Sequence, residues 1–155
     1  MKIAVDDLSG PKIAAFLQEH VDEMRAITPP ESTHALDLDG LRRPEVTFWS
    51  VYEGAELLGC GALKELDGSS GEVKSMRTAG AAKRRGVAST LLDHIVAEAR
   101  RRGYDRLYLE TGSFEFFAPA RGLYEKFGFE YCAPFAGYKE DPNSAYMVKI
   151  LATAD

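Results

Sequence analysis

Cysteine and long apolar runs are scarce in this sequence. It contains two cysteines in 155 residues, Cys60 and Cys132, which lie far apart without CxxC spacing or a neighbouring histidine-rich cluster. That pattern argues against a disulfide framework and a metal site, so we expect two reduced, partly buried thiols and no bound metal. No stretch approaches the roughly 20 apolar residues that cross a bilayer, and the first residues lack the apolar run of a signal peptide. We therefore expect a soluble, cytoplasmic protein with no membrane partner.

Positive charge is also limited and is unevenly placed. The formal net charge is -5, and residues 1–70 carry 6 Lys and Arg against 13 Asp and Glu, whereas residues 71–155 carry 13 against 11. Nucleic-acid binding needs a broad basic face, so we expect no nucleic-acid partner. The stretch 74–90 nevertheless holds five cationic side chains and no acidic one. Such a confined basic segment is suited to a small anion.

The length and the apolar patterns predict one α/β (α+β) domain over residues 1–155. With 45% hydrophobic residues the chain can form a substantial core. Residues 26–41, which contain two prolines followed by Ser, Thr, His and Asp, are expected to form a loop and a short capped helix, a possible lid. The spacing of apolar residues and the turn residues predict helices over 10–24, 88–99 and 119–127, and strands over 46–53, 56–65, from 72 onward, 106–111, 130–135 and 145–151.

The segment KRRGVAS, residues 83–89, lies between a strand and the clearest helix of the chain. A glycine turn that opens a helix presents unpaired backbone N–H groups and the positive end of the helix dipole, which together bind phosphate. Gly86 and Ala88 lack bulk, so a pyrophosphate could approach the backbone closely. A basic, solvated loop is an equal alternative from the residues alone. A nucleotide-hydrolysing P-loop is excluded because Val87 stands where that motif has lysine.

Residues 72–92 resemble the acyl-CoA-binding motif of the GCN5-related N-acetyltransferase (GNAT) superfamily. Its core pattern, [QR]-x-x-G-x-[GA], is matched by residues 83–88 with Lys83 at the first position. Residues 120–129 are similar to the second signature, A-x-x-L-Y-x-x-x-G-F, although Phe117 stands where many members have Asn. The resemblance covers essentially the whole chain. It implies a mixed, mostly antiparallel central sheet that is flanked by helices and splayed at the acyl-CoA site.

The resemblance also implies the activity and the residues that carry it. The expected reaction is transfer of the acetyl group of acetyl-CoA to a primary amine by direct attack, without a metal. Tyr124 would protonate the departing thiolate, and backbone N–H groups near Met76 and Thr78 would stabilise the oxyanion. Glu72 or Glu110 would accept the proton of the amine, with Glu72 slightly preferred, unless both are ordinary exposed carboxylates. The residues expected to contact the cofactor are Met76, Arg77, Thr78, Lys83, Arg84, Arg85, Gly86, Val87, Ala88 and Ser89.

The acceptor cannot be identified from these residues. His34, Phe114, Phe117 and Tyr138 are expected to line its pocket, since aromatic side chains and a loop histidine suit a substrate entrance. The acidic N-terminal half would suit a cationic acceptor, either a small molecule or a peptide amine, but could equally be solubilising surface. A non-catalytic acyl-CoA-binding sensor or scaffold is the alternative function, which the presence of Tyr124 disfavours. A homodimer is left open.

Overall fold

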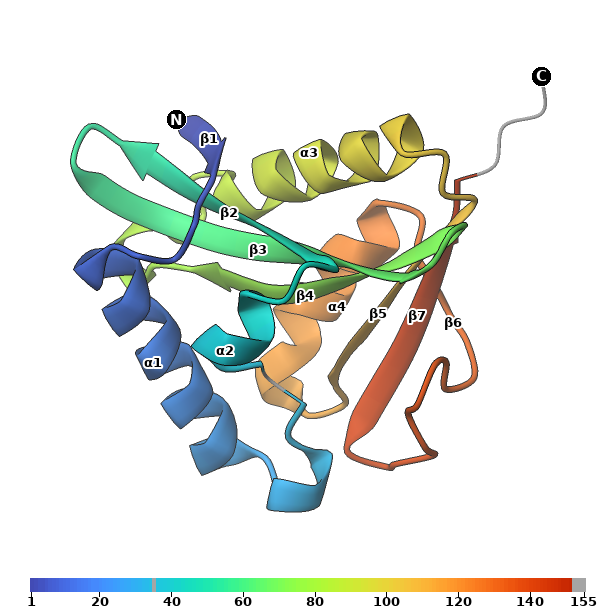
Figure 1. Cartoon of the computed structure of the whole chain (residues 1–155). Coiled ribbons are helices and arrows are strands. Elements are labelled where there is room, and N and C mark those ends of the chain that lie inside the picture. The colour runs from blue at the N-terminus through green and yellow to red at the C-terminus, as the bar shows by residue number, and fades with distance from the viewer. Residues whose placement is uncertain (35, 152–155) are drawn as a thin grey trace.

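The computed structural model describes residues 1–34 and 36–151 and is built on one seven-stranded sheet. The strand order is β1-β2-β3-β4-β5-β7-β6, and helices cover both faces (Figure 1). The strands are β1 (Lys2–Val5), β2 (Val46–Glu53), β3 (Glu56–Asp67), β4 (Ser70–Thr78), β5 (Arg106–Gly112), β6 (Glu130–Tyr131) and β7 (Ser144–Ile150). The helices are α1 (Pro11–Ile27), α2 (Leu38–Leu41), α3 (Val87–Arg101) and α4 (Ala118–Lys126), with short 3₁₀ turns η1 (Pro30–Ser32), η2 (Gly80–Ala82) and η3 (Glu115–Phe117).

The sheet contains one parallel neighbour pair, β4 and β5. Every other pairing in the described chain is antiparallel, which confirms the mostly antiparallel sheet that the sequence predicts. The register between β4 and β5 begins at Ser70–Arg106 and ends at Val73–Leu109. Beyond that pair the two strands diverge, as Figure 1 shows. The sheet is therefore split near its middle, and we refer to this opening as the splay.

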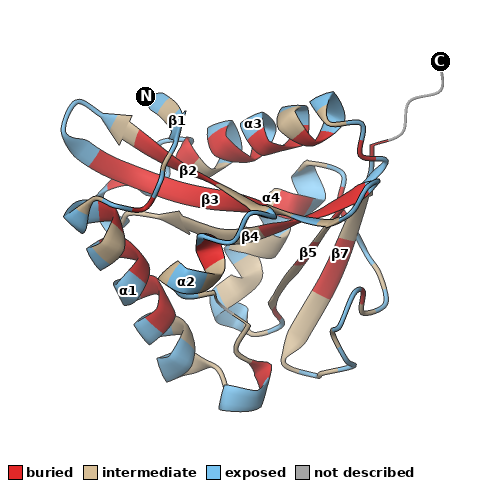
Figure 2. Cartoon of the chain, viewed as in Figure 1, coloured by how far each residue is buried: buried red, intermediate tan, exposed pale blue. Residues whose placement is uncertain are grey.

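The two faces of the sheet carry separate hydrophobic cores, because successive strand residues point in opposite directions. Trp49 and Leu63 join the core that α3 and α4 cover, whereas Phe48 and Ala62 join the core beneath α1 and α2. Figure 2 shows the buried stripe of α3 facing the sheet. Burial of one large apolar side chain stabilises the fold by roughly 1.5–3 kcal/mol, so both cores hold the strands on either side of the splay in place.

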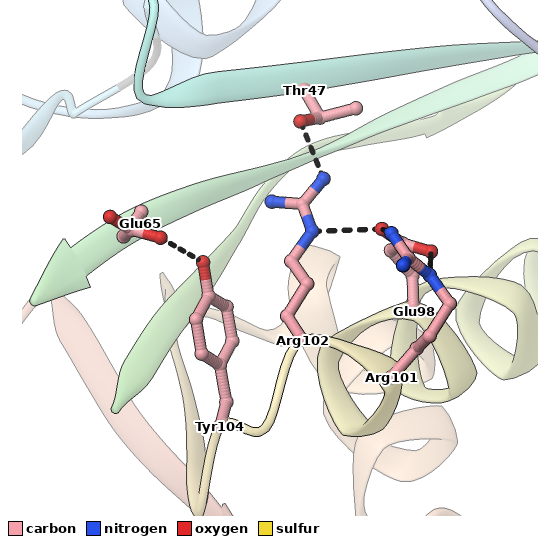
Figure 3. Close-up of polar contacts among 6 residues, drawn as sticks. All are labelled: Thr47, Glu65, Glu98, Arg101, Arg102 and Tyr104. Atoms are coloured by element: carbon pink, nitrogen blue, oxygen red, sulfur yellow. Dashed lines mark hydrogen bonds and ion pairs between the residues drawn. The ribbon is translucent and has the colours of Figure 1, made fainter. Parts of the chain in front are cut away.

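The C-terminal end of α3 is fixed to the sheet by polar contacts (Figure 3). Glu98 accepts hydrogen bonds from Arg101 at 2.6 Å and from Arg102 at 2.8 Å, and these hydrogen bonds lower the pKa of its carboxyl to about 2. Arg102 also donates to Thr47 on β2 at 2.8 Å. The Tyr104 hydroxyl donates to a β3 carboxylate at 2.6 Å. The arginines at this helix end therefore anchor α3 as well as complementing its dipole.

Two segments differ from the sequence-based expectation. β1 was not predicted, because a four-residue edge strand offers too short a pattern. The strand predicted over 130–135 is wrong beyond Tyr131: Pro134 cannot donate a ladder hydrogen bond, and Ala136 adopts a positive φ of 51°, so the chain leaves the sheet. Within residues 1–34 and 36–151, none of the helices combines the length and the apolarity that crossing a membrane requires.

Candidate functional site

The free edge of β4 forms one side of the splay. Residues 74–78 continue β4 past its last pair with β5, so on this edge their backbone groups have no strand partner. A β-bulge lies in the same segment, where Ser75 has a φ of 55° and the register with β3 shifts between Cys60 and Ala62. Bulges commonly reorient backbone next to active sites. Free N–H groups near Met76 and Thr78 could therefore bind a carbonyl oxygen placed in the splay.

The side chains of Met76 and Arg77 point away from this edge. Met76 packs over Gly61, where an added Cβ would lie 2.6 Å from the methionine sulfur. Arg77 donates to Glu23 on α1 at 2.9 Å and lies over the Phe16 ring at 5.3 Å from its centroid. Of the β4 residues that the sequence assigned to the cofactor, these two therefore offer their backbone rather than their side chains.

The start of α3 has the geometry of an anion site. Gly86 is its N-cap and has a φ of 79°, a conformation that glycine adopts without strain. The backbone N–H of Thr90 donates to the Gly86 carbonyl at 3.0 Å. The N–H groups of Val87, Ala88 and Ser89 precede this bond, and no acidic residue lies in the first turn. These three amides thus remain free to bind phosphate oxygens.

The three basic residues before α3 have different surroundings. Arg85 donates to Glu53 at 2.7 Å and lies 3.8 Å from Glu56, so its guanidinium faces the β2–β3 hairpin. Lys83 and Arg84 make no ion pair with any residue in the described part of the chain. The charges of Lys83 and Arg84 are thus available to an anion, whereas the guanidinium of Arg85 contacts the carboxylates of the hairpin.

Glu72 is buried rather than exposed at a strand start. It is the third residue of β4 and is 2% exposed. Its Oε2 accepts hydrogen bonds from the Tyr138 hydroxyl at 2.6 Å and from Lys74 Nζ at 3.1 Å. Both donors bind the same oxygen of the carboxylate, Oε2.

Glu110 lies on β5, one residue past the last pair with β4, and its environment favours proton exchange near neutrality. Burial raises the pKa of its carboxyl to about 7, although a hydrogen bond from the Ser144 hydroxyl at 2.8 Å and the positive charge of Lys74 oppose that rise. The negative charge of Glu72 contributes in the same direction as burial. A carboxyl with this pKa can accept a proton at neutral pH and release it again.

Tyr124 lies on α4, within range of the charge of Glu110. Its ring is buried and contacts Phe129 edge-on at a centroid distance of 5.8 Å. Burial raises the pKa of its hydroxyl well above the usual value, and the charge of Glu110 adds to this rise. The hydroxyl therefore stays protonated at neutral pH and can act as a proton donor.

A pocket of about 690 Å³ lies on the α1–α2 face beside Glu72. His34 and Tyr138, two residues that the sequence assigned to substrate binding, meet there edge-on with ring centroids 4.9 Å apart. The loop of residues 132–143 forms most of one wall, and it is joined to η1 by hydrogen bonds of Ser32 with Asp141 and Asn143. The other lining residues are Ala136, Gly137, Lys139, Glu140 and Pro142 from this loop, and Glu31, Lys64, Leu66 and Glu72 from elsewhere in the chain.

Phe114 and Phe117 do not line this pocket. They lie in the connection between β5 and α4, where the Phe117 ring covers Gly112 so closely that an added Cβ would lie 2.1 Å from it. Arg121 fixes the connection by donating to the carbonyl oxygens of Gly112 at 2.7 Å and Phe114 at 2.8 Å. Phe117 therefore packs at the end of β5.

Sequence reasoning missed several residues near the pocket. Lys74 could have been found, because residues 72 and 74 must share a face of any strand. Tyr108, Phe135 and Tyr146 extend the aromatic contacts of Tyr138: Phe135 stacks on Tyr108 at 4.7 Å, and Tyr146 lies 5.5 Å from Tyr138 between centroids. No sequence signal links these residues, because they come from β5, a loop and β7.

A sheet split between β4 and β5, beside a helix that begins at a glycine with free amides, is the arrangement of an acyl-CoA-binding fold. The model of the Acetyltransferase (GNAT) family matches residues 13–129. The chain belongs to this family and is an N-acetyltransferase, which confirms the resemblance and the enzyme class expected from the sequence.

A curated relative supports the family, and two solved structures share the fold. The chain is 58% identical over 151 residues to the N-acetyltransferase YsnE of Bacillus subtilis (strain 168), covering 97% of this chain and 100% of that protein. An acyl-CoA N-acyltransferase of Klebsiella pneumoniae has the same fold, with a TM-score of 0.78, 24% identity and 97% of each chain covered. An aminoglycoside 6'-N-acetyltransferase in complex with coenzyme A gives a TM-score of 0.71 at 14% identity, covering 100% of this chain and 99% of that one.

Proposed function

We propose that the protein transfers acetyl from acetyl-CoA directly to a primary amine while both substrates are bound. The observation that carries this proposal is the buried Glu110 carboxyl, which lies on β5 one residue past its last pair with β4 and whose pKa is raised to about 7. The hydroxyl of Tyr124, whose pKa the charge of Glu110 helps to raise, is the proton donor proposed beside it. Acetyl-CoA would lie along the free edge of β4, with its pyrophosphate at the amides of residues 87–89. No covalent enzyme intermediate is needed.

Glu110 is the better candidate for the base than Glu72, which the sequence favoured. Glu72 already accepts two hydrogen bonds, whereas Glu110 accepts one and titrates near neutral pH. In the proposed reaction the neutral amine attacks the thioester carbon, a C–N bond forms and the C–S bond breaks. Glu110 takes the proton of the amine, and Tyr124 supplies one to the sulfur.

The acceptor is a cationic primary amine, small enough to enter the pocket or presented by a peptide. Four carboxylates line the pocket, at Glu31, Glu72, Glu140 and Asp141, against two ammonium groups, at Lys64 and Lys139. The excess of negative charge favours a positively charged ligand. The aromatic rings of Tyr138 and His34 offer an apolar surface beside it.

Initial rates with a panel of primary amines, followed as acetyl-CoA-dependent release of free thiol, test this function. For the best acceptor, both substrates are varied and we expect double-reciprocal plots that intersect, because both must be bound before reaction. Parallel lines would indicate a covalent acetyl-enzyme and contradict direct attack. Binding of acetyl-CoA without turnover of any amine would favour the sensor or scaffold alternative.

Replacing Gly86 with Val is expected to weaken acetyl-CoA binding by about 100-fold or more, because a shifted turn loses two or more hydrogen bonds to charged phosphate oxygens. Isothermal calorimetry with coenzyme A measures the loss. Gly54→Val is the matched control: Gly54 also has a positive φ, 62°, and open space around an added Cβ, but lies in the β2–β3 turn. Equal binding by a folded Gly86→Val protein and its parent would contradict the phosphate assignment.

A further inference from the structure

Three side chains on the α1–α2 face of the sheet form a closed ring of hydrogen bonds. The Tyr138 hydroxyl donates to Glu72 Oε2 at 2.6 Å, and Lys74 Nζ donates to the same oxygen at 3.1 Å. Lys74 Nζ also donates to the Tyr138 oxygen at 2.9 Å. The side chains of Glu72 and Lys74 are 3% and 9% exposed. The ring is therefore shielded from water.

Stability alone gives a weak account of this ring. Removing two charges from water costs about as much as their mutual attraction returns, so apolar side chains of similar volume often serve a fold equally well. Each of the three side chains is nevertheless hydrogen-bonded to the other two. Their placement beside the splay suggests a role in the reaction.

Lys74 and Glu110 occupy equivalent positions on neighbouring strands. The last pair of β4 and β5 is Val73–Leu109, and Lys74 and Glu110 are the next residue on each strand. Side chains at matching positions of paired strands share a face. Lys74 therefore brings a positive charge to the start of the splay on the same face as Glu110, and this charge acts on the Glu110 carboxyl.

The groups that face Glu110 come from every element around it. β4 contributes Glu72 and Lys74, the loop of residues 132–143 contributes Asp141 and Tyr138, β7 contributes Ser144 and Tyr146, and α4 contributes Tyr124. Within this set of described residues Lys74 is the single cation. Its loss would leave Glu72 and Glu110 as neighbouring carboxylates without a counter-charge.

We propose that Lys74 is a positioning residue for acetyl transfer: it holds Glu72 in the ring with Tyr138 and keeps Glu110 as the carboxylate that accepts the proton of the amine. This inference rests on the proposed role of Glu110. Without Lys74, the Glu110 carboxyl loses the charge that opposes the rise of its pKa and keeps the like charge of Glu72, so its pKa rises further. Proton transfer from the acceptor would then require a higher pH.

The acid limb of kcat/KM against pH tests the proposal in three variants. In Lys74→Met the limb should move to higher pH by about 1–2 units, because Glu110 loses the cation that favours its charged form. In Glu72→Gln it should move to lower pH, because the like charge is removed and Lys74 remains. In the double variant the two changes oppose each other, so the limb should return toward its parental position. At a pH below the limb, Lys74→Met should therefore lose about tenfold or more in kcat/KM, which the double variant largely recovers.

Further variants separate charge from packing. Lys74→Arg keeps the positive charge and should keep the limb closer to its parental position than Lys74→Met does. Lys2→Met removes a lysine from the distant strand β1 and should leave the limb unchanged, since surface charge at that range is screened by salt. If Lys74→Met does not fold, Lys74→Gln decides, because it also removes the positive charge and its limb should lie at higher pH than that of the parent.

The outcomes distinguish this inference from the function on which it rests. An acid limb that Glu110→Gln removes but that Lys74→Met, or Lys74→Gln in its place, leaves unmoved would overturn the role of Lys74 and retain Glu110 as the base. An acid limb that survives in Glu110→Gln would overturn both. Opposite shifts in Lys74→Met and Glu72→Gln, with recovery in the double variant, would establish the positioning role.

Discussion

Replacing Glu110 with Gln is expected to lower kcat/KM by about 100- to 10,000-fold at neutral pH, because the acceptor amine loses the group that takes its proton. The pKa of the Glu110 carboxyl, raised to about 7, determines the shape of the profile of kcat/KM against pH. Below that pH the carboxyl of the parent is protonated and cannot act as a base, so activity falls. The variant has no such group, and its profile should lack this limb.

The acceptor itself also titrates, so the measurement compares two amines of different pKa. A limb that moves with the amine belongs to the substrate, and a limb that stays belongs to the enzyme. The deficit of Glu110→Gln should shrink at high pH, where more of the amine is already neutral. Parental activity at neutral pH in a folded Glu110→Gln protein would exclude this residue as the base.

Unfolding measurements show whether such a loss reflects chemistry or folding. The folded-state pKa of Glu110 lies above its ordinary value of 4.5, so the folded state binds the proton more tightly than the unfolded state. The favourable contribution of Glu110 to the free energy of unfolding is therefore fully present below pH 4.5. It is lost as the pH rises through about 7. Glu110→Gln carries no charge, and at pH 8 its free energy of unfolding should equal or exceed that of the parent.

The parts of the site that the sequence predicted are those fixed by local backbone geometry. Gly86 precedes a strongly periodic helix, and its positive φ and free amides follow from glycine chemistry. The second signature likewise placed Tyr124 on a helix that stops before Gly128, whose φ is 89°. The order of strands and helices was also predicted from the sequence, because long periodic segments can be recognised without knowledge of distant contacts.

The parts that the sequence could not predict depend on contacts between distant segments. Tyr138 reaches Glu72 across 66 residues, and this contact changes Glu72 from a free carboxylate into an occupied one. The bulge at Ser75 has no local signature, since serine rarely adopts a φ of 55°. The choice between Glu72 and Glu110 as the proposed base rests on such contacts, which the position of a residue in a strand does not reveal.

Replacing Tyr124 with Phe is expected to lower kcat by about 10- to 10,000-fold while acetyl-CoA affinity and thermal stability change little. The substitution removes the hydroxyl alone and keeps the buried ring that contacts Phe129. Because the raised pKa of Tyr124 keeps its proton in place at neutral pH, the parent can protonate the departing thiolate throughout the working range. Water can partly replace this proton donor, which accounts for the low end of the range.

The pH dependence of the deficit distinguishes a proton donor from a packing residue. Above the pH at which free thiols ionise, about 8.5, a thiolate leaves without needing a proton, so the penalty of Tyr124→Phe should shrink. A stability defect would not shrink in this way. Tyr131→Phe provides the matched control, since Tyr131 is exposed on β6 and its hydroxyl donates to Glu125 at 2.9 Å. Rates are measured under conditions where chemistry limits turnover. A folded Tyr124→Phe protein with parental kcat at neutral pH would remove this hydroxyl from the mechanism and leave Tyr124 as part of the core beneath α4.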